Sequence, residues 1–593
     1  MCGIYGYFDT YGLRLSDSVL SHMGKVINHR GPDGNGCYHD EARSVALGNQ
    51  RLAILDVEHG HQPFISDDRS IIVVQNGEIF NHVELAADLR NAGFDCKTHC
   101  DTEVILRLYE RDGIEGISKL NGMFAIAIYD KAEERLFLVR DRVGEKPLYY
   151  HYNGTKLLFG SEIKSILKGR DSNFIPSPEA IDQFLTYNYI PPPLTIFEGI
   201  YHVMPGHYLE VSKEGVKEKC WWDIARIKEQ NFSESEWIEK FNALLEDSVR
   251  LRLRSDVPFG AFLSGGVDSS SVVGLMSKCL NDPVRTFCIG FDDVNYDESP
   301  YAFSAAERFR TCHKMQKVKA NLIDLWPLAT YHCDQPHGDV SFLPTYKVAS
   351  LAVNDVKMVL TGDGADELFA GYDKYKSFFA NDVSQMSDLD FQEKYIESIS
   401  LFNQCDKSQL YTTHFKQTLN DHDSIGVARY FFNKSSTMDR INQALYIDFM
   451  MLLPGNNLVK PDRMGMAVSL ETRAPFLDYR MMELAFSMPG SLKLKNGETK
   501  YIYKKAVAPL IGKDLAYRKK QMFTVPVGEW FKDELLPLCQ DLLLSERAQR
   551  RNIFDVMFLE KILYEHIKGI SNYTRQIRAI MALEIWFREF IDD

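Results

Sequence analysis

The sequence predicts two domains of different class: an α+β domain, followed by a doubly wound parallel α/β domain with added helices. Three observations predict this. A chain of 593 residues is too long for one hydrophobic core. Up to roughly residue 210, short apolar runs are separated by turn signals, which is typical of antiparallel strands. From about residue 236, apolar runs that end in glycine turns alternate with helices, as in a parallel sheet.

The first half is expected to form a mixed two-layer or sandwich domain over residues 2–213. Turn signals such as Asn76-Gly77 separate its strands, and its two helices carry apolar residues at helical spacing. The expected strands are 71–74, 124–129 and 136–139, and the expected helices are 83–92 and 102–111.

The second half is expected over residues 236–593, after a polar stretch. In a doubly wound sheet, the ligand crevice lies at the carboxyl ends of the strands. The stretch from about 541 to 593 has the apolar spacing of packed helices. The expected strands are 257–263, 284–291 and 357–360, with a helix at 271–280.

The bulk composition restricts the class of partner and the compartment. A net charge of -14 argues against a nucleic-acid-binding protein, which would present a basic face. The eleven cysteines include no C-x-x-C pair, and no secretory leader precedes them, so free thiols in a reducing cytoplasm are expected. No apolar run approaches the roughly 20 residues of a membrane span.

The run SGGVDSS at 264–270 lies between a predicted strand and a predicted helix. Glycines let a backbone approach phosphate oxygens, and the first N–H groups of a helix point at them, so this arrangement predicts an anion cradle. The lysine of a Walker loop is absent. An ordinary Ser/Gly turn is the alternative for S-G-G alone, but the whole run resembles the pyrophosphate loop of the N-type ATP pyrophosphatases. The candidate ATP-binding residues are Leu263, Ser264, Gly265, Gly266, Asp268, Ser269 and Ser270.

Asp268 and Asp366 are the acidic residues best placed at the expected crevice. Two carboxylates that face phosphates are unfavourable unless a cation intervenes, so both are predicted to hold Mg²⁺ bridged to pyrophosphate. The alternative for Asp268 is that it caps the following helix.

Cys2 is a candidate nucleophile. Removal of Met1 would leave it with a free α-amine, whose ordinary pKa near 8 suits a base that activates the thiol. A cysteine at position 2 also occurs without any catalytic role, so the neighbouring motifs decide. These motifs are HRGPD at 29–33, QRLAI at 50–54, NGEIFN at 76–81 and CDTE at 100–103.

Together with MCGI, these motifs resemble the class II glutamine amidotransferases in order and spacing. The resemblance implies the αββα fold of the N-terminal nucleophile hydrolases. It also implies that Cys2 attacks the glutamine side-chain amide and releases ammonia through a γ-glutamyl thioester. The Asn76 amide and the Gly77 N–H would form the oxyanion hole. Glu78 and Asp101 suit the substrate α-ammonium, and Arg51 suits its α-carboxylate.

In the second half, SGGVDSS, TFCIGF (286–291), TGDGADELFAGY (361–372) and LETRAPFLD (470–478) resemble the synthetase domain of the asparagine synthetase family. By that resemblance Ile289, Thr361 and Gly362 line the ATP site with Leu263. Lys500 would lie near the reacting phosphate or acyl-adenylate, where its charge suits the transition state. Arg463 and Arg473 are weaker candidates, with ion pairing in the core as their alternative.

The implied reaction uses glutamine, ATP and Mg²⁺ to amidate a carboxylate, with AMP and pyrophosphate as products. Ammonia would be protonated in bulk water, so a dry passage between two sites is expected. The family carries a glutamate, thought to deprotonate ammonia, where this chain has Asp363. Its aspartate-binding stretch includes an arginine, whereas residues 321–346 here contain no lysine or arginine. Other cations, Lys347, Lys374 or Arg463, would have to serve.

L-aspartate is the first expectation for the acceptor, and another carboxylate, such as a sugar uronic acid or a cell-wall precursor, is the alternative. Two further readings are a ligase with an inactive glutaminase half and a non-catalytic scaffold. Relatives of the first kind lack the N-terminal cysteine, which this chain has. The family often forms dimers, so a homodimer is also expected.

Overall fold

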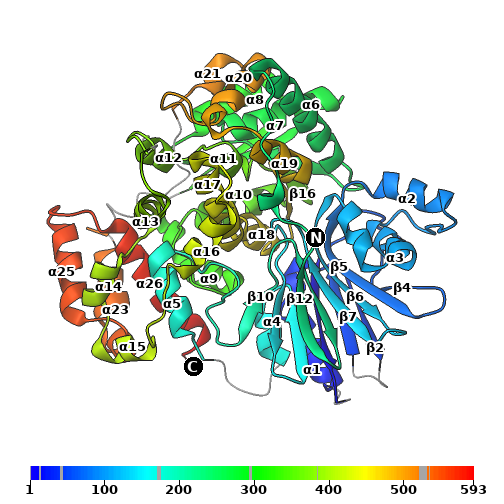
Figure 1. Cartoon of the computed structure of the whole chain (residues 1–593), viewed down its shortest axis with the longest axis horizontal. Helices are drawn as coiled ribbons and strands as arrows, with labels where there is room; N and C mark the ends of the chain where they lie inside the picture. Colours follow the sequence, from blue (N-terminus) through cyan, green and yellow to red (C-terminus); the bar gives the residue numbers. More distant parts are fainter. Residues whose placement is uncertain are drawn as a thin grey trace.

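The computed structural model describes residues 2–11, 15–40, 45–169, 175–292, 297–318, 320–383, 385–519, 531–532 and 535–592. Figure 1 shows the strands of the first domain on one side of the molecule and the helix-rich second domain beside and above them. No helix of the described part is long and apolar enough to cross a bilayer.

The first domain contains two antiparallel six-stranded sheets, and its expected fold class is confirmed. One sheet has the order β10 (Ile200–His202), β8 (Tyr149–Tyr152), β9 (Lys156–Gly160), β1 (Gly3–Asp9), β3 (Val45–Arg51), β2 (Gly34–Asp40). The other has the order β12 (Gly215–Cys220), β11 (His207–Ser212), β7 (Arg135–Arg140), β6 (Gly122–Asp130), β5 (Ile71–Ile79), β4 (Phe64–Ile65).

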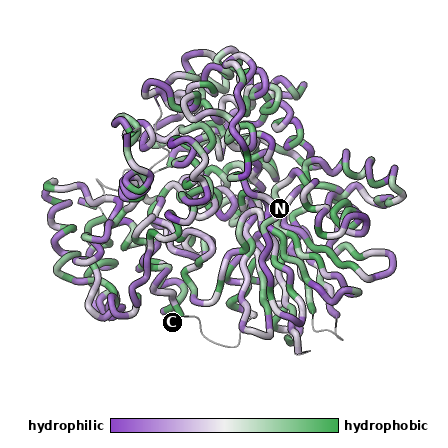
Figure 2. Tube along the Cα trace, in the orientation of Figure 1, coloured by the Kyte–Doolittle hydropathy of each residue, from purple (hydrophilic) through white to green (hydrophobic). Residues whose placement is uncertain are grey.

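The two sheets stack face to face, with helices on their outer faces. On β5, Ile72 and Val74 join the core between the sheets, while Ile71 and Val73 face a separate cluster under the helices. This two-residue alternation is the side-chain period of a strand, so a strand buried on both faces needs apolar residues at nearly every position. Helices α1 (Asp17–Lys25) and α4 (Ile163–Gly169) cover the first sheet, and α2 (His82–Asn91) and α3 (Asp101–Asp112) cover the second. Figure 2 shows green, hydrophobic stretches along these strands.

The second domain is built on a parallel five-stranded sheet. Its order is β15 (Cys312–Val318), β14 (Arg285–Phe291), β13 (Phe259–Phe262), β16 (Met358–Leu360), β17 (Glu471–Arg473). The strand order reverses between β13 and β16, so the carboxyl ends of these two strands flank the expected ligand crevice. On β16, Met358 and Leu360 face one hydrophobic cluster and Val359 the other.

Helices pack on both faces of this sheet and extend beyond it. Those nearest the sheet are α6 (Glu234–Arg252), α7 (Val267–Cys279), α8 (Ser299–Phe309), α9 (Trp326–Cys333), α10 (Phe342–Ala352), α11 (Ala365–Leu368), α18 (Val459–Met466), α19 (Tyr479–Ser487), α20 (Tyr501–Ile511) and α21 (Lys513–Ala516). The outer helices are α12 (Asp373–Phe378), α13 (Asp388–Ile399), α14 (Gln404–Leu410), α15 (Thr413–Thr418), α16 (Gly426–Lys434), α17 (Arg440–Ile447), α23 (Leu536–Leu544), α24 (Glu546–Gln549), α25 (Val556–Ile567) and α26 (Thr574–Phe590).

Three elements differ most from the sequence expectation. Strand β5 runs to Ile79 rather than to 74, so Asn76-Gly77, expected as a turn, lies inside the strand and pairs with β6. Helix α7 begins at Val267 rather than at 271, so the second half of SGGVDSS forms its first turn. Strand β12 lies in the polar stretch after residue 213 and completes the second sheet. Polar and glycine residues misled all three expectations. Asn-Gly is a common turn signal, hydroxyl residues cap or start a helix, and a solvent-facing edge strand needs few apolar residues.

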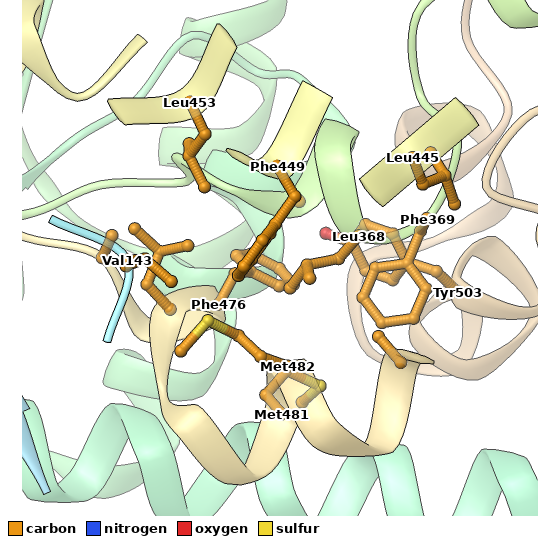
Figure 3. Packing of buried hydrophobic residues seen from close by; sticks show 14 of the residues in the cluster. Val143, Leu368, Phe369, Leu445, Phe449, Leu453, Phe476, Met481, Met482 and Tyr503 are labelled. Carbon is orange, nitrogen blue, oxygen red and sulfur yellow. The ribbon is translucent and has the colours of Figure 1, made fainter. Parts of the chain in front are cut away.

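The two domains share a hydrophobic cluster where they meet. Met123 and Val143 of the first domain belong to the same buried cluster as Phe449 and Phe476 of the second. Figure 3 shows Val143 beside these aromatic side chains. The two domains therefore meet across a packed, apolar interface.

Candidate active sites

Cys2 lies at the start of β1, 6% exposed. Its backbone N–H donates to Oδ1 of Asn76 (3.1 Å), and Nε of Arg30 donates to its carbonyl (3.1 Å). Burial raises the pKa of the Cys2 thiol, while hydrogen bonds from the Leu52 backbone and the Asn49 side chain act in the opposite direction. The thiol therefore needs a base or a nearby positive charge to become a thiolate at neutral pH.

Asn76 and Gly77 lie on β5 beside Cys2. Asn76 is fully buried, and its Nδ2 donates to Oγ of Ser161 (3.3 Å). A Cβ at Gly77 would lie 2.0 Å from the carbonyl oxygen of Met123, and the residue has a φ of +151°. This position requires glycine, which leaves its peptide close to the cysteine accessible to a small ligand.

Glu78 and Asp101 also meet at this site. Oδ2 of Asp101 accepts from Nε2 of Gln75 (3.1 Å) and from the Ile79 N–H (2.8 Å), so one of its oxygens holds β5 in place. Oε2 of Glu78 is buried without a hydrogen-bond partner among the described residues. Burial raises the pKa of Glu78 well above its ordinary value, and the Asp101 carboxylate adds to this shift. An incoming ammonium would donate a hydrogen bond to the unpaired oxygen of Glu78 and would offset the repulsion between the two carboxylates.

Arg51 is engaged by its own loop. Its guanidinium donates to the carbonyls of Val57 (3.0 Å), Leu55 (3.2 Å) and Asp56 (2.7 Å). These bonds fix the arginine at the end of β3 and occupy part of its donor set of five N–H groups. A substrate carboxylate would use the remaining donors.

Three residues that the sequence did not assign to the glutamine site lie at it. Arg473, from β17 of the second domain, has Nη2 3.6 Å from Oε1 of Glu78 and donates from Nε to Glu471 (2.6 Å). The Asn49 side chain hydrogen-bonds to the Cys2 thiol, and Arg30 donates a hydrogen bond to the Cys2 carbonyl. The HRGPD motif pointed to Arg30, but Arg473 is 395 residues from Glu78, and only the domain packing brings them together.

The glycine loop of the second domain follows β13. Gly265 has a φ of +71°, and a Cβ there would lie 2.3 Å from the carbonyl carbon of Tyr301. Oγ of Ser264 and Oγ of Ser269 lie 3.1 Å apart across the loop. Oγ of Ser270 is buried with no partner in the described structure. The loop and the start of α7 thus form the polar turn that an anion cradle needs.

Asp268, Asp366 and Lys500 form one cluster at this loop. Nζ of Lys500 donates to both carboxylate oxygens of Asp268 (2.7 Å each) and lies 2.8 Å from Oδ1 of Asp366. Burial lowers the pKa of Lys500, but the two carboxylates more than offset this and raise it overall. The structure brings together the predicted metal ligands and the predicted catalytic lysine.

The donor set of this cluster fits a magnesium ion. Two carboxylates converge on one point, where they contact a single ammonium group. Mg²⁺ in proteins is commonly bound by one or two carboxylates together with substrate phosphates. Asp268 and Asp366 would hold it.

Asp363 and its neighbours follow β16. Oγ1 of Thr361 donates to Oδ2 of Asp363 (2.6 Å). Burial raises the pKa of Asp363, and the nearby carboxylates of Asp268 and Asp366 raise it further. A Cβ at Gly362 would lie 2.7 Å from Cβ of Asp268, so β16 and α7 approach closely here. A carboxyl with a raised pKa is suited to accept a proton from a nitrogen nucleophile.

Leu263 and Ile289 are buried at the ends of β13 and β14, in different hydrophobic clusters. The structure therefore places them on adjacent strands without packing them into a common core.

A small cavity lies between the two halves. Its lining includes Glu145 and Lys146 of the first domain and Thr361, Asp363 and Asp462 of the second. Burial raises the pKa of Glu145 to about 8, and Asp141 contributes to this shift. A dry passage between the sites was expected, and this cavity has ionisable groups on its wall.

Two of the three cations proposed from sequence for the acceptor, Arg463 and Lys374, are engaged elsewhere. Arg463 lies between Glu162 (2.9 Å) and Asp334 (3.3 Å) at the domain interface. Lys374 contacts Asp448 (2.7 Å). Both are held in ion pairs, as the alternative for Arg463 anticipated.

Comparison with known proteins adds independent information. A family model described as asparagine synthase matches residues 240–588, and one described as a glutamine amidotransferase domain matches residues 1–222. Glutamine-hydrolysing asparagine synthetase 1 of Bacillus subtilis is 32% identical over 99% of this chain and 96% of its own length. Asparagine synthetase 3 of the same organism is 29% identical over 90% of this chain and 89% of its own. The amidase chyE of Penicillium rubens is 28% identical over 94% and 93%.

Proposed function

The chain belongs to the asparagine synthase family and is a glutamine-hydrolysing amidotransferase of asparagine synthetase type, and on this premise we propose that it converts L-aspartate to L-asparagine. The observation that carries the proposal is the cavity between the halves, which is lined by Asp363 and Thr361 of the second half and by Glu145 and Lys146 of the first. An amide-forming enzyme with separate glutaminase and adenylation sites needs such a space for ammonia.

In the glutaminase half, residues 2–213 by our proposal, Cys2 attacks the side-chain carbonyl carbon of glutamine. Ammonia leaves as the γ-glutamyl thioester forms, and water then releases glutamate. The Asn76 amide and the Gly77 N–H stabilise the oxyanion, an effect typically worth about 3–4 kcal/mol per donor. Glu78 and Asp101 bind the α-ammonium, and Arg51 binds the α-carboxylate.

In the synthetase half, residues 236–593 by our proposal, the acceptor carboxylate attacks the α-phosphorus of the substrate ATP and pyrophosphate leaves. Ser264, Gly265 and Gly266 with the start of α7 bind the phosphates. Lys500 neutralises charge that develops at the reacting phosphate. Asp268 and Asp366 would hold Mg²⁺, which neutralises the pyrophosphate leaving group.

Asp363 accepts a proton as ammonia attacks the acyl-adenylate. The Asp363→Asn variant should therefore lose asparagine formation while it retains aspartate-dependent exchange between ATP and pyrophosphate. Loss of both reactions would assign Asp363 to adenylation instead.

The acceptor assignment is supported by charge near Asp363. Nζ of Lys460 lies 2.9 Å from Oδ2 of Asp339, and it interacts electrostatically with Asp363. Asp339 also interacts electrostatically with Arg578 of α26. Nε of Arg578 is buried without a hydrogen-bond partner in the described part of the chain. Residues 321–346 contain no lysine or arginine, so Lys460 and Arg578 provide the positive charge near this segment. The α-carboxylate of aspartate would bind to this positive charge.

One experiment tests the acceptor. ATP-dependent pyrophosphate release is measured with glutamine and a panel of carboxylates: L-aspartate, a sugar uronic acid, a peptidoglycan precursor and a monocarboxylate. We expect aspartate to stimulate release at least tenfold and to yield asparagine. If only the uronic acid or the precursor stimulates release, aspartate is not the acceptor, and the proposed mechanism still holds. These compounds are included because one relative is an amidase.

A further inference from the structure

Arg518 follows α21 and lies against the glycine loop of the synthetase half. A Cβ placed on Gly266 would be 3.8 Å from Nη2 of Arg518. The guanidinium carbon lies 4.3 Å from the centre of the Tyr301 ring. Since the backbone of Tyr301 also packs on Gly265, the arginine and the loop share one rigid support on α8.

The donors of this arginine are only partly used. Its side chain is 10% exposed, and Nη2 donates to Oε1 of Glu298 (2.6 Å). Nε and Nη1 are buried and have no hydrogen-bond partner in the described structure. Buried N–H groups without partners cost free energy, and a guanidinium is the side chain best matched to phosphate oxygens.

The charge balance of the loop leaves a role for such a residue. The loop has no lysine of its own, and Lys500 is held between Asp268 and Asp366. Pyrophosphate is highly charged, and backbone N–H groups with one magnesium ion would leave part of that charge uncompensated.

We propose that Arg518 binds the β- and γ-phosphates of ATP and holds the pyrophosphate leaving group at the glycine loop. This rests on the proposed function, in which ATP is cleaved between the α- and β-phosphates. Glu298 is a positioning residue, because it fixes Nη2 at the side of the loop through the observed ion pair.

The test compares wild type with Arg518→Gln, Arg518→Lys and the control Arg308→Gln. Arg308 lies on the same helix as Tyr301 but pairs with Asp514 (2.8 Å), an exposed carboxylate, instead of with Glu298. Binding of inorganic pyrophosphate and of AMP, each with Mg²⁺, is measured by calorimetry, and glutamine hydrolysis is measured in parallel. We expect Arg518→Gln to weaken pyrophosphate binding and to raise the KM for ATP about tenfold or more. AMP binding, glutamine hydrolysis and the control should stay within about twofold, and Arg518→Lys should recover part of the loss.

Three outcomes would overturn the proposal. Pyrophosphate affinity within twofold of wild type in folded Arg518→Gln would remove Arg518 from the phosphate site. An equal loss of AMP and pyrophosphate binding would mean that Arg518 supports the local fold. A wild-type protein that binds neither ATP nor pyrophosphate would overturn both this inference and the proposed function, whereas the first two outcomes leave the proposed function intact.

Discussion

Burial and hydrogen bonding have opposite effects on the pKa of the Cys2 thiol. The apolar surroundings disfavour a thiolate, whereas the Asn49 side chain and the Leu52 backbone favour it. A free α-amine on the same residue, present once Met1 is removed, would tip this balance locally. The chemistry of the first half therefore depends on one side chain and its own main-chain nitrogen.

We predict that Cys2→Ala abolishes glutamine-dependent product formation, because the proposed thioester forms on the Cys2 thiol. Product formation with ammonium chloride should stay near the wild-type rate, since the synthetase site lies across the domain interface. The measurement is amide product with each nitrogen source. If the ammonia-dependent reaction is lost as well, Cys2 has a structural role.

A second prediction concerns Glu145. Its pKa is raised by burial from the ordinary 4.5 to about 8, so the folded protein holds a proton that the unfolded chain releases between these values. The free energy of unfolding should therefore fall as pH rises from about 4.5 to 8. Glu145→Gln should remove this part of the pH dependence. At most, the free energy of unfolding would lose several kcal/mol of its change between these pH values. Urea unfolding at pH 5 and pH 8.5 checks it, and identical pH slopes in the two proteins would contradict it.

At the scale of elements, the C-terminal helix α26 holds parts of both domains together. Trp586 is fully buried, its Nε1 donates to the carbonyl of Asp334 (3.0 Å), and its ring packs edge-on against Phe197 (5.2 Å). Helix α26 also packs against α9, whose following loop carries Asp334 and Asp339. The helix therefore positions the loop beside the proposed acceptor site.

We predict that Trp586→Ala destabilises the protein by about 3–5 kcal/mol, because it leaves a large cavity and an unpaired carbonyl. Trp586→Phe should retain most of the packing and cost less. Chemical denaturation measures both. A loss below about 1 kcal/mol for the alanine variant would mean that α26 is weakly docked.

At the scale of the whole molecule, buried charges join the two halves. Arg30 of the first domain donates to both carboxylate oxygens of Asp462 of the second (2.9 and 3.0 Å), and Asp462 also lies on the inter-site cavity. Burial opposes ionisation of Asp462, but the charge of Arg30 keeps its pKa below the ordinary value.

We predict that Asp462→Asn lowers the fraction of ammonia from glutamine that ends up in asparagine. The buried Arg30 loses one of its charge partners at the cavity wall in this variant. More glutamate should form per asparagine, because ammonia escapes, and stability should fall by roughly 3–5 kcal/mol or less. The exposed pair of Arg254 and Glu84 (2.6 Å) also joins the domains, and Glu84→Gln serves as the control with little expected change. A glutamate-to-asparagine ratio equal to that of wild type would disprove the role of Asp462.

Local patterns were sufficient for the fold class and for most element positions. A short apolar run such as Ile71 to Val74 indicates a buried strand, and the glycines of SGGVDSS indicate a close backbone approach. Asn76-Gly77 indicated a turn, but it lies inside β5. The start of α7 was placed four residues too late, because Ser269 and Ser270 have weak helix preference and tertiary contacts decide there.

The sequence by itself determined which groups the two sites would contain, because motifs such as SGGVDSS hold their chemistry within a few adjacent residues. Only the tertiary structure decided which distant charges complete those sites. Arg473 lies beside Glu78 and Arg518 beside the glycine loop, and Arg578 interacts electrostatically with Asp339, although each pair is separated by more than two hundred residues. Side chains of this kind have no local signature, because their role depends on how the domains and the C-terminal helix pack.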